Sequence, residues 1–200
     1  MIDGVIKYDF QFTKSEPLSV EKYLEIESVR ERLYALNLIG VTEDGIGFGN
    51  ISRRIDTNSF VITGTQTGHL AKLLGEHYSL VEEYNDKEFY LKSSGSIKPS
   101  SEALTHGTIY NLSSKIGAVI HIHSKEIWNF MLTHDYLKTK AVEYGSVEMI
   151  DEVNQIFSNI EPLSNPKFVM AGHEEGVMAF GEDLVEAEMA LMEILEEMGK

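Results

Sequence analysis

Hydrophobic and polar residues recur with two different periods along the chain, and each period predicts a different kind of element. Apolar residues at helical spacing predict a long helix from about Ser19 to Asn37 and a last helix from about Asp183 to the end of the chain. Shorter helices are predicted over 69–76, 100–114, 125–132 and 147–158. Strands are predicted over 51–55, 60–63, 167–171 and 176–180, with a hairpin over 81–93. Residues 1–17 predict an irregular arm with one short strand over 5–12.

The clearest strand pattern lies between Ala118 and Ser124, where β-branched residues alternate with polar ones. Side chains two positions apart point to the same face of a strand. His121 and His123 therefore share one face, while Ile120 and Ile122 share the other and can enter a core. Two imidazoles side by side on a rigid strand are half of a metal site. The alternative is that both histidines line a solvated strand face, and the strand by itself leaves both interpretations open.

The order of these elements limits the possible fold classes. Helices and strands alternate along the chain, and several strands follow one another directly. This pattern predicts a three-layer α/β/α domain with a mostly antiparallel or mixed central sheet. Neither an internal repeat nor a linker interrupts the sequence, so residues 1–200 are predicted to form a single domain.

Composition and charge narrow the possible functions. The chain has no cysteine, so a metal ion would have to be held by His, Asp or Glu. The net charge of −15, without a basic patch in the sequence, argues against binding to nucleic acid or to an anionic membrane. The sequence shows no signal-peptide pattern and no run of about 18 apolar residues. A cytoplasmic protein is the expectation.

The predicted helix that follows Pro99 begins with polar side chains suited to an anion. The first N–H groups of a helix are unpaired, and the hydroxyls of Ser100 and Ser101 stand beside them. An ordinary capped helix start would look the same. Glu102 precedes His121 by one helix, so a helix that packs back onto the histidine strand could bring this carboxylate towards the imidazoles.

A catalytic metal needs a third protein ligand, and His173 is the best candidate. It lies in a glycine-bounded turn between two predicted strands, although a turn histidine can also simply face water. His106 lies one turn after Glu102 and could support the site or face solvent. The histidines expected at the surface are His69, His77 and His134. Three glycines between Asp44 and Asn50 predict a sharp turn or a close backbone approach.

Four segments, in order, resemble the class II aldolase and adducin family: Gly49 to Ser52, Thr63 to Gly68, Lys98 to Glu102 with His106, and Ala118 to Ser124. Gly172-His173 with Gly176 and the acidic last helix extend the match over about residues 20–200. The order and spacing of the segments are more specific than any single motif.

The resemblance implies an α/β/α fold and a fourfold-symmetric homotetramer with active sites between subunits. It also implies Zn²⁺, or another divalent cation such as Mn²⁺, Co²⁺ or Fe²⁺, on His121, His123 and His173. By the same resemblance Glu102 is the acid/base and also binds the metal when no substrate is present. The residues expected to cradle a substrate phosphate are Gly49, Asn50, Thr67, Gly68, Ser100 and Ser101.

The expected activity is an aldolase-type cleavage of a small sugar phosphate or a similar hydroxy-carbonyl compound. A divalent cation stabilises the enediolate as a Lewis acid, and Glu102 moves a proton to or from the adjacent carbon. An epimerase, a dehydratase and a non-catalytic adducin-head-like binding module are the alternatives. The three histidines and Glu102 favour an enzyme over the binding module, and the long helices argue against a cupin-like metal barrel.

Two features depart from the family pattern. Glu174 and Glu175 stand between His173 and Gly176, where the family has glycine directly after the histidine. Two extra carboxylates could bind the metal or repel an anionic substrate. The segment from His123 to Tyr144 is shorter than in the family's aldolases, so their substrate-side tyrosine has no clear match there.

Overall fold

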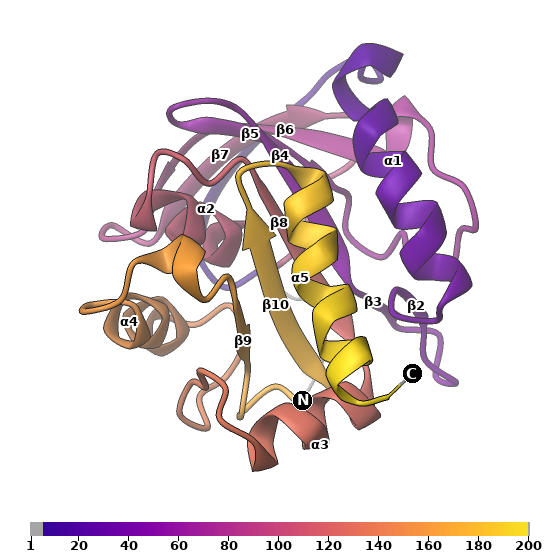
Figure 1. Ribbon diagram of the computed structural model, residues 1–200. Coiled ribbons are helices and arrows are strands. Elements are labelled where there is room, and N and C mark those ends of the chain that lie inside the picture. The colour runs from indigo at the N-terminus through magenta and orange to yellow at the C-terminus, as the bar shows by residue number, and fades with distance from the viewer. Residues whose placement is uncertain (1–5, 200) are drawn as a thin grey trace.

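A computed structural model describes residues 6–199, which form one eight-stranded mixed sheet covered by helices on both faces (Figure 1). The strand order is β1-β7-β6-β5-β4-β8-β10-β9. The strands are β1 Asp9–Lys14, β4 Asn50–Asp56, β5 Ser59–Thr63, β6 Tyr78–Asn85, β7 Tyr90–Gly95, β8 Ala118–His123, β9 Lys167–Val169 and β10 Gly176–Gly181. The pairing of β1 with β7 is parallel, and the other pairs in this sheet are antiparallel.

The helices form two layers, one on each face of the sheet. The helices are α1 Val20–Ala35, α2 Ala103–Leu112, α3 Lys125–Thr133, α4 Val147–Ile156 and α5 Leu184–Glu197, with short 3-10 turns at Gly75–His77 and Pro162–Ser164. Residues of α1, α3 and α5 share one buried cluster, and residues of α2 and α4 share the other. The predicted three-layer α/β/α fold with a mixed sheet is therefore confirmed.

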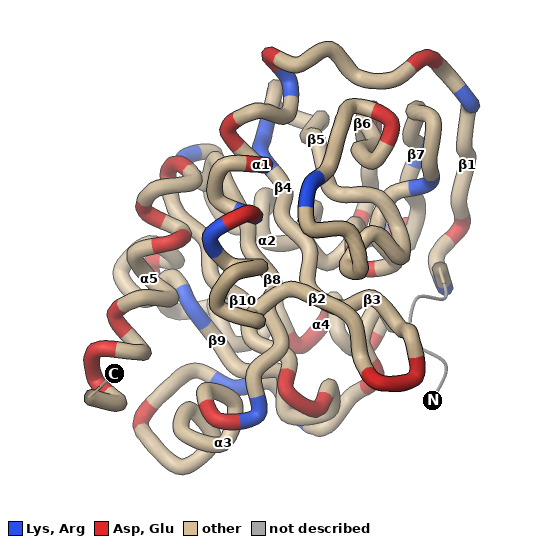
Figure 2. Tube along the Cα trace, turned by 90° about the vertical axis from the view of Figure 1, so that its right-hand side faces the viewer, with Lys and Arg blue, Asp and Glu red and all other residues tan. Residues whose placement is uncertain are grey.

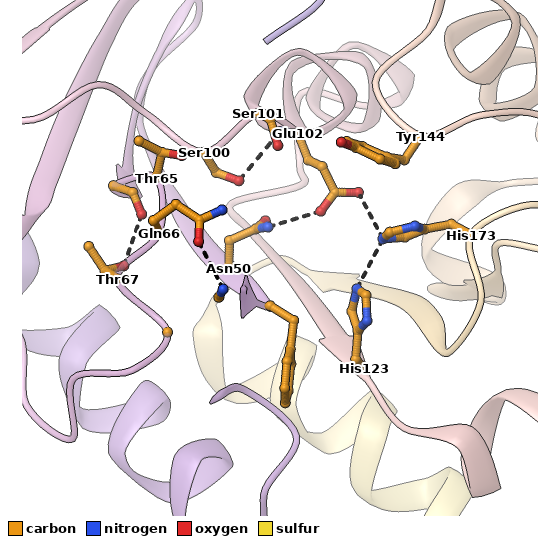
Figure 3. Close-up of a pocket in the computed structure, with 15 residues that line it drawn as sticks. Asn50, Thr65, Gln66, Thr67, Ser100, Ser101, Glu102, His123, Tyr144 and His173 are labelled. Carbon is orange, nitrogen blue, oxygen red and sulfur yellow. Dashed lines mark hydrogen bonds and ion pairs between the residues drawn. The ribbon is translucent and has the colours of Figure 1, made fainter. Parts of the chain in front are cut away.

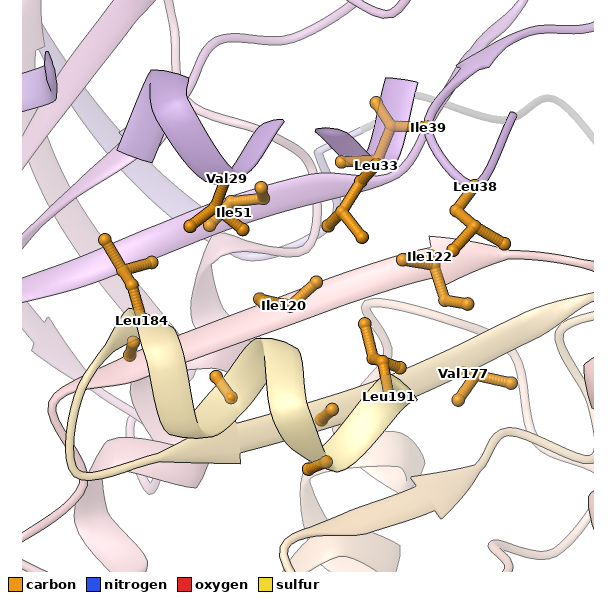
Figure 4. Close-up of a cluster of buried hydrophobic side chains, with 14 of the residues drawn as sticks. Val29, Leu33, Leu38, Ile39, Ile51, Ile120, Ile122, Val177, Leu184 and Leu191 are labelled. Carbon is orange, nitrogen blue, oxygen red and sulfur yellow. The ribbon is translucent and has the colours of Figure 1, made fainter. Parts of the chain in front are cut away.

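Strand β8 lies in the middle of the sheet, between β4 and β10, and its two faces differ as its sequence predicts. Ile120 and Ile122 are fully buried with Leu33 of α1 and Leu191 of α5 (Figure 4). Fully burying such a side chain stabilises the fold by about 1.5–3 kcal/mol. The same packing fixes which face His121 presents, because a one-residue shift of the strand would turn Ile120 and Ile122 out of this cluster and toward the other face of the sheet.

The helix predicted over 69–76 is wrong. Residues 67–74 follow an irregular path that ends in the short 3-10 turn Gly75–His77. Their backbone groups bond to side chains of α1, because Leu70 O accepts from the Arg30 guanidinium and Leu73 N–H donates to the Glu27 carboxylate. Those bonds replace the ones that a helix would have made.

Two other element boundaries in the structure differ from the predicted ones. The helix predicted from Ser100 begins at Ala103, because Ser100 N–H bonds back to Thr63 O on β5 and holds 100–102 as a turn. The N-terminal strand is β1 Asp9–Lys14, whereas its predicted start at Val5 lies outside the described residues.

The remaining predicted elements are present with small shifts, and a separate two-residue pair, β2 Gly40–Val41 with β3 Gly47–Phe48, forms a short hairpin beside the sheet. Acidic positions recur on the outer helices and loops, including Glu43 and Asp44 at the tip of this hairpin (Figure 2). Among the described residues, each helix is too short or too polar to cross a membrane.

Candidate metal centre

Three histidines from distant parts of the chain converge at one end of the central strands. His121 and His123 project from β8, and His173 comes from the turn that joins β9 to β10. The Nε2 atom of His123 lies 3.0 Å from the Nε2 of His121 and 3.0 Å from that of His173 (Figure 3 shows the second pair). The ligand atoms of the three residues lie within 4.8 Å of one another. The side chains predicted as metal ligands are therefore placed together.

Hydrogen bonding shows that these nitrogens suit a cation. The Nδ1 atom of His121 lies 3.1 Å from Val177 O, a group that can only accept, so Nδ1 carries the proton. In a neutral ring the Nε2 lone pair is then directed at the other two imidazoles. Burial, together with the charges of His121 and His173, lowers the pKa of His123 well below its ordinary value. Lone pairs that face one another at this distance repel unless they share a proton or a metal ion, and a trio of neutral imidazoles is a common divalent-metal donor set.

Glu102 completes the centre from the position directly before α2. Its Oε2 lies 2.9 Å from His121 Nε2 and accepts a hydrogen bond of 3.0 Å from the Asn50 amide, and its Oε1 lies 4.0 Å from His173 Nε2. Burial alone would raise the pKa of Glu102, but positive charge on the imidazoles that face it, His121 first and then His173 and His123, outweighs burial and lowers the pKa. A bound cation would supply the same positive charge when the rings are neutral. The side chain is therefore a carboxylate, held by Asn50 and aimed at the imidazoles.

A cavity opens in front of this centre, and the predicted cradle residues line it. Gly49, Asn50, Thr67, Gly68, Ser100 and Ser101 share its wall with Glu102, His123 and His173. Among the described residues that line the cavity, neither Lys nor Arg occurs. An anion there would be bound by N–H and hydroxyl groups. The hydroxyl of Thr67 already donates to Gly64 O at 2.9 Å, which leaves its oxygen as an acceptor.

Glycines bring the backbone close to the centre, as their spacing predicts. Gly49 has a left-handed backbone (φ 77°), and an added Cβ would lie 2.7 Å from Ile39 Cγ1. At Gly176 an added Cβ would lie 2.6 Å from His173 Cδ2 and 3.2 Å from His121 Cε1. Gly176 therefore leaves room for two of the three imidazoles.

His106 lies inside the protein and does not face solvent. It is fully buried, and its Nδ1 lies 2.7 Å from the Ser52 hydroxyl, which in turn lies 2.7 Å from Tyr110 OH. Burial lowers the pKa of His106 to about 3, so its ring is neutral. Of the other histidines, His69 and His134 are exposed, as expected.

Six residues of the cavity wall are not among the predicted site residues, and three of them have side chains that contact the site or its loops. Tyr144 lines the cavity with its ring centroid 4.8 Å from that of His173, in the segment where no substrate-side tyrosine was matched. Phe48 stacks on His123 at 5.4 Å, and Gln66 accepts a hydrogen bond from Gly47 N–H at 2.9 Å. Tyr144 belongs to a segment without a periodic pattern, so the residues around it carry no signal. Phe48, however, lies inside the Gly-Phe-Gly run that was already singled out.

The two extra carboxylates lie beside the centre without joining it. Glu174 is exposed and Glu175 is half-buried with a left-handed backbone (φ 69°). Within the part of the chain that the structure describes, neither belongs to the group of metal-ligating side chains or to the cavity wall. Glu175 O instead accepts a hydrogen bond from Ser124 N–H at 2.9 Å, which closes the turn against the end of β8.

Comparison with known proteins agrees with this architecture. The family model for the class II aldolase and adducin N-terminal domain matches residues 36–200. The 3-oxo-tetronate 4-phosphate decarboxylase of Haemophilus influenzae is 29% identical over 157 residues, which cover 70% of each chain. An L-fuculose 1-phosphate aldolase structure superposes with a TM-score of 0.68 at 18% identity, over 90% of this chain and 84% of the other. The L-fuculose-1-phosphate aldolase of Thermus thermophilus gives 0.64 at 20% identity, over 89% and 91%. Because the family model spans most of the chain, this protein belongs to the class II aldolase and adducin N-terminal domain family.

Proposed function

We propose that this protein is a divalent-metal-dependent lyase that breaks a carbon–carbon bond beside the carbonyl of a small phosphorylated hydroxy-carbonyl compound. The observation that carries this proposal is the convergence of three imidazole Nε2 atoms and one buried carboxylate beside a single cavity, which His123, His173 and Glu102 line. A bound divalent cation would supply Lewis-acid stabilisation for the negative charge that develops on the substrate oxygens.

The protein's own groups account for the rest of the chemistry. His121, His123 and His173 would hold the cation, with Zn²⁺ as the first choice for three nitrogen ligands. Glu102, charged and held by the Asn50 amide, would move the proton at the carbon next to the carbonyl. The backbone and hydroxyl groups of the cavity wall would bind the phosphate, since no lysine or arginine lines the described wall.

Decarboxylation is the second candidate, and the similarity to the Haemophilus influenzae decarboxylase favours it. In 3-oxo-tetronate 4-phosphate the bond between the carboxylate and its neighbouring carbon would break, and CO₂ would leave. The electron pair would remain as an enediolate, and a proton that Glu102 takes from water and passes to the carbon would convert it to dihydroxyacetone phosphate. Cleavage of a 2-ketose 1-phosphate between its third and fourth carbons leaves the same enediolate and an aldehyde. One centre could therefore serve either reaction, and the group that leaves distinguishes them.

A single assay tests both reactions. The zinc-loaded protein would be incubated with 3-oxo-tetronate 4-phosphate or with a 2-ketose 1-phosphate, and released dihydroxyacetone phosphate would be measured with a coupled NADH-dependent dehydrogenase. Release of CO₂ or of an aldehyde then identifies the reaction. Exchange of a substrate proton from dihydroxyacetone phosphate into D₂O measures the half-reaction alone. A metal-loaded protein that gives neither release nor exchange would refute the proposal and favour a binding module of the adducin-head type.

Assembly as a homotetramer, with a neighbouring subunit completing the cavity, remains a prediction. Light scattering of the purified protein measures the mass directly, and a monomer that is fully active would contradict it.

A further inference from the structure

A buried ion pair on α1 lies directly behind the cavity wall. Arg30 is only 1% exposed, and its guanidinium donates to three backbone carbonyls, Leu70 O at 2.6 Å, Thr67 O at 3.3 Å and Ala71 O at 3.4 Å. A buried guanidinium is costly unless its donors are satisfied, and here most of its partners belong to one irregular segment. The Arg30 guanidinium therefore holds the backbone of residues 67–71 in its irregular conformation.

Glu27 lies nearly one turn earlier on the same helix and binds the other end of that segment. Its carboxylate accepts from Leu73 N–H at 2.6 Å and from Tyr78 OH at 2.6 Å, and it lies 4.0 Å from the Arg30 guanidinium. Both residues precede residue 36, the first residue that the family model matches. The pair therefore lies on α1, outside the part of the chain that the family model matches.

The segment needs such an external support, because its conformation is not one that its own sequence favours. Gln66 has a left-handed backbone (φ 57°), which costs a non-glycine residue free energy and persists only when its surroundings enforce it. Gly68 packs so closely on the hairpin β2–β3 that an added Cβ would lie 1.9 Å from Gly40 O. Both residues line the cavity (Gln66 is labelled in Figure 3).

The geometry of a peptide group transmits the charge of Arg30 to the cavity. In a trans peptide the C=O and the following N–H point in opposite directions. Because Thr67 O points to the Arg30 guanidinium, the N–H of Gly68 points away from Arg30. Gly68 lines the cavity, and its nitrogen lies 3.1 Å from the position of a Cβ added at Gly47, another residue of the wall. A cation behind the carbonyl polarises this peptide and strengthens the N–H as a donor to an anion. It does so where the net charge of −15 would otherwise repel a phosphate.

We propose that Arg30, oriented by Glu27, is a positioning residue that sets the phosphate-binding edge of the cavity at Thr67 and Gly68. This inference rests on the proposed function for the identity of the anion. Arg30 does not touch the substrate; it fixes and polarises the loop that does.

The test compares Arg30→Met with Arg32→Met, a matched control on the same helix whose guanidinium is half-exposed and pairs with Glu188 far from the cavity. Metal-loaded variants would be assayed with the phosphorylated substrate and with its dephosphorylated counterpart. Arg30→Met should raise KM for the phosphorylated substrate by about tenfold or more, which corresponds to losing the hydrogen bond that the displaced Gly68 N–H would make to the phosphate. The value of kcat, the metal content and KM for the dephosphorylated substrate should change little, and Arg32→Met should behave as the parent protein.

Other outcomes decide against the inference. A folded Arg30→Met protein with unchanged KM, or one that loses kcat while KM is unchanged, would overturn it.

If Arg30→Met does not fold, Arg30→Lys, which keeps the charge but loses the planar fork, is judged by the same measurements, and a smaller rise in KM is expected. If the parent protein turns over no substrate, the proposed function fails, and titration with inorganic phosphate decides instead. Phosphate binding that weakens in the Arg30 variant alone supports the inference, whereas equal binding, or none to the parent, refutes it.

Discussion

Substitution of Glu102 by Gln separates metal binding from proton transfer. The carboxylate is 5% exposed and lies between the Asn50 amide and the His121 imidazole. Glutamine has nearly the same shape, and its carbonyl oxygen can still accept the hydrogen bond from Asn50. It has no basic oxygen, however, and cannot take up or return a proton at neutral pH. The three imidazoles are untouched, so Glu102→Gln should bind the metal as the parent protein does.

The size of the expected loss follows from the role of the group. Positioned acid–base catalysis contributes about a hundredfold to ten-thousandfold to a rate. Each factor of ten corresponds to about 1.36 kcal/mol of activation free energy, so Glu102→Gln should raise the barrier by roughly 3–5 kcal/mol. Because the interaction is made with the reacting atoms, kcat should fall while KM changes little.

Two measurements on one preparation check this prediction. Metal content by atomic emission should stay equal to that of the parent protein, and exchange of the dihydroxyacetone phosphate proton into D₂O should fall with kcat. Glu83→Gln, an exposed carboxylate on β6, is the control and should leave both values unchanged. Full turnover in Glu102→Gln would show that another group moves the proton, and loss of the metal would show that Glu102 is an obligatory ligand.

Three further substitutions probe the centre, the core and the cavity wall. His173→Ala should remove most of the bound metal, measured by atomic emission against the exposed His134→Ala; retained metal would point to Glu174 or Glu175 as a replacement ligand. Ile120→Ala should lower the free energy of unfolding by about 2–5 kcal/mol in a urea titration, because its side chain is fully buried. A loss as small as that of Ile55→Ala, which is 45% exposed, would contradict that packing. Gly68→Ala should displace the hairpin at Gly40 O and raise KM for a phosphorylated substrate, and an unchanged KM would separate this loop from phosphate binding.

The metal centre was predictable because its residues follow local rules. Alternation along β8 places His121 and His123 on one face, and this holds in the structure because Ile120 and Ile122 are anchored in the core. The position of His173 between two short strands also follows from the sequence, since antiparallel pairing of β10 with β8 brings the turn back beside the other histidines. Gly176 pairs directly with His123 in that register.

The cavity wall was less predictable, because distant residues determine it. The apolar spacing of Leu70, Leu73 and Leu74 suggests a helix, yet Arg30 and Glu27 bond to the backbone of that segment from a helix about 40 residues earlier. In the sequence both charged residues look like part of the solvated face of α1, and nothing local distinguishes Arg30 from the exposed Arg32. The backbone of residues 67–74 could bond within a helix or to the side chains of Arg30 and Glu27. Only tertiary packing decides between these two sets of hydrogen bonds.

The histidine centre lies mainly on a regular strand, whereas the cavity wall lies mainly on loops. This difference bears on how one fold can serve several reactions. Two of the three histidines that could hold a cation lie on a central strand whose register is fixed on both sides, so the position of such a cation would be hard to change. The wall consists largely of loop residues held by side chains of α1 and by close glycine contacts with a two-residue hairpin. Changes in those loops would alter which anion is bound and how the scissile bond lies, without disturbing the ligands. Under the proposed function, formation of the enediolate would depend on the three histidines and Glu102, whereas the group that leaves would depend on the cavity wall.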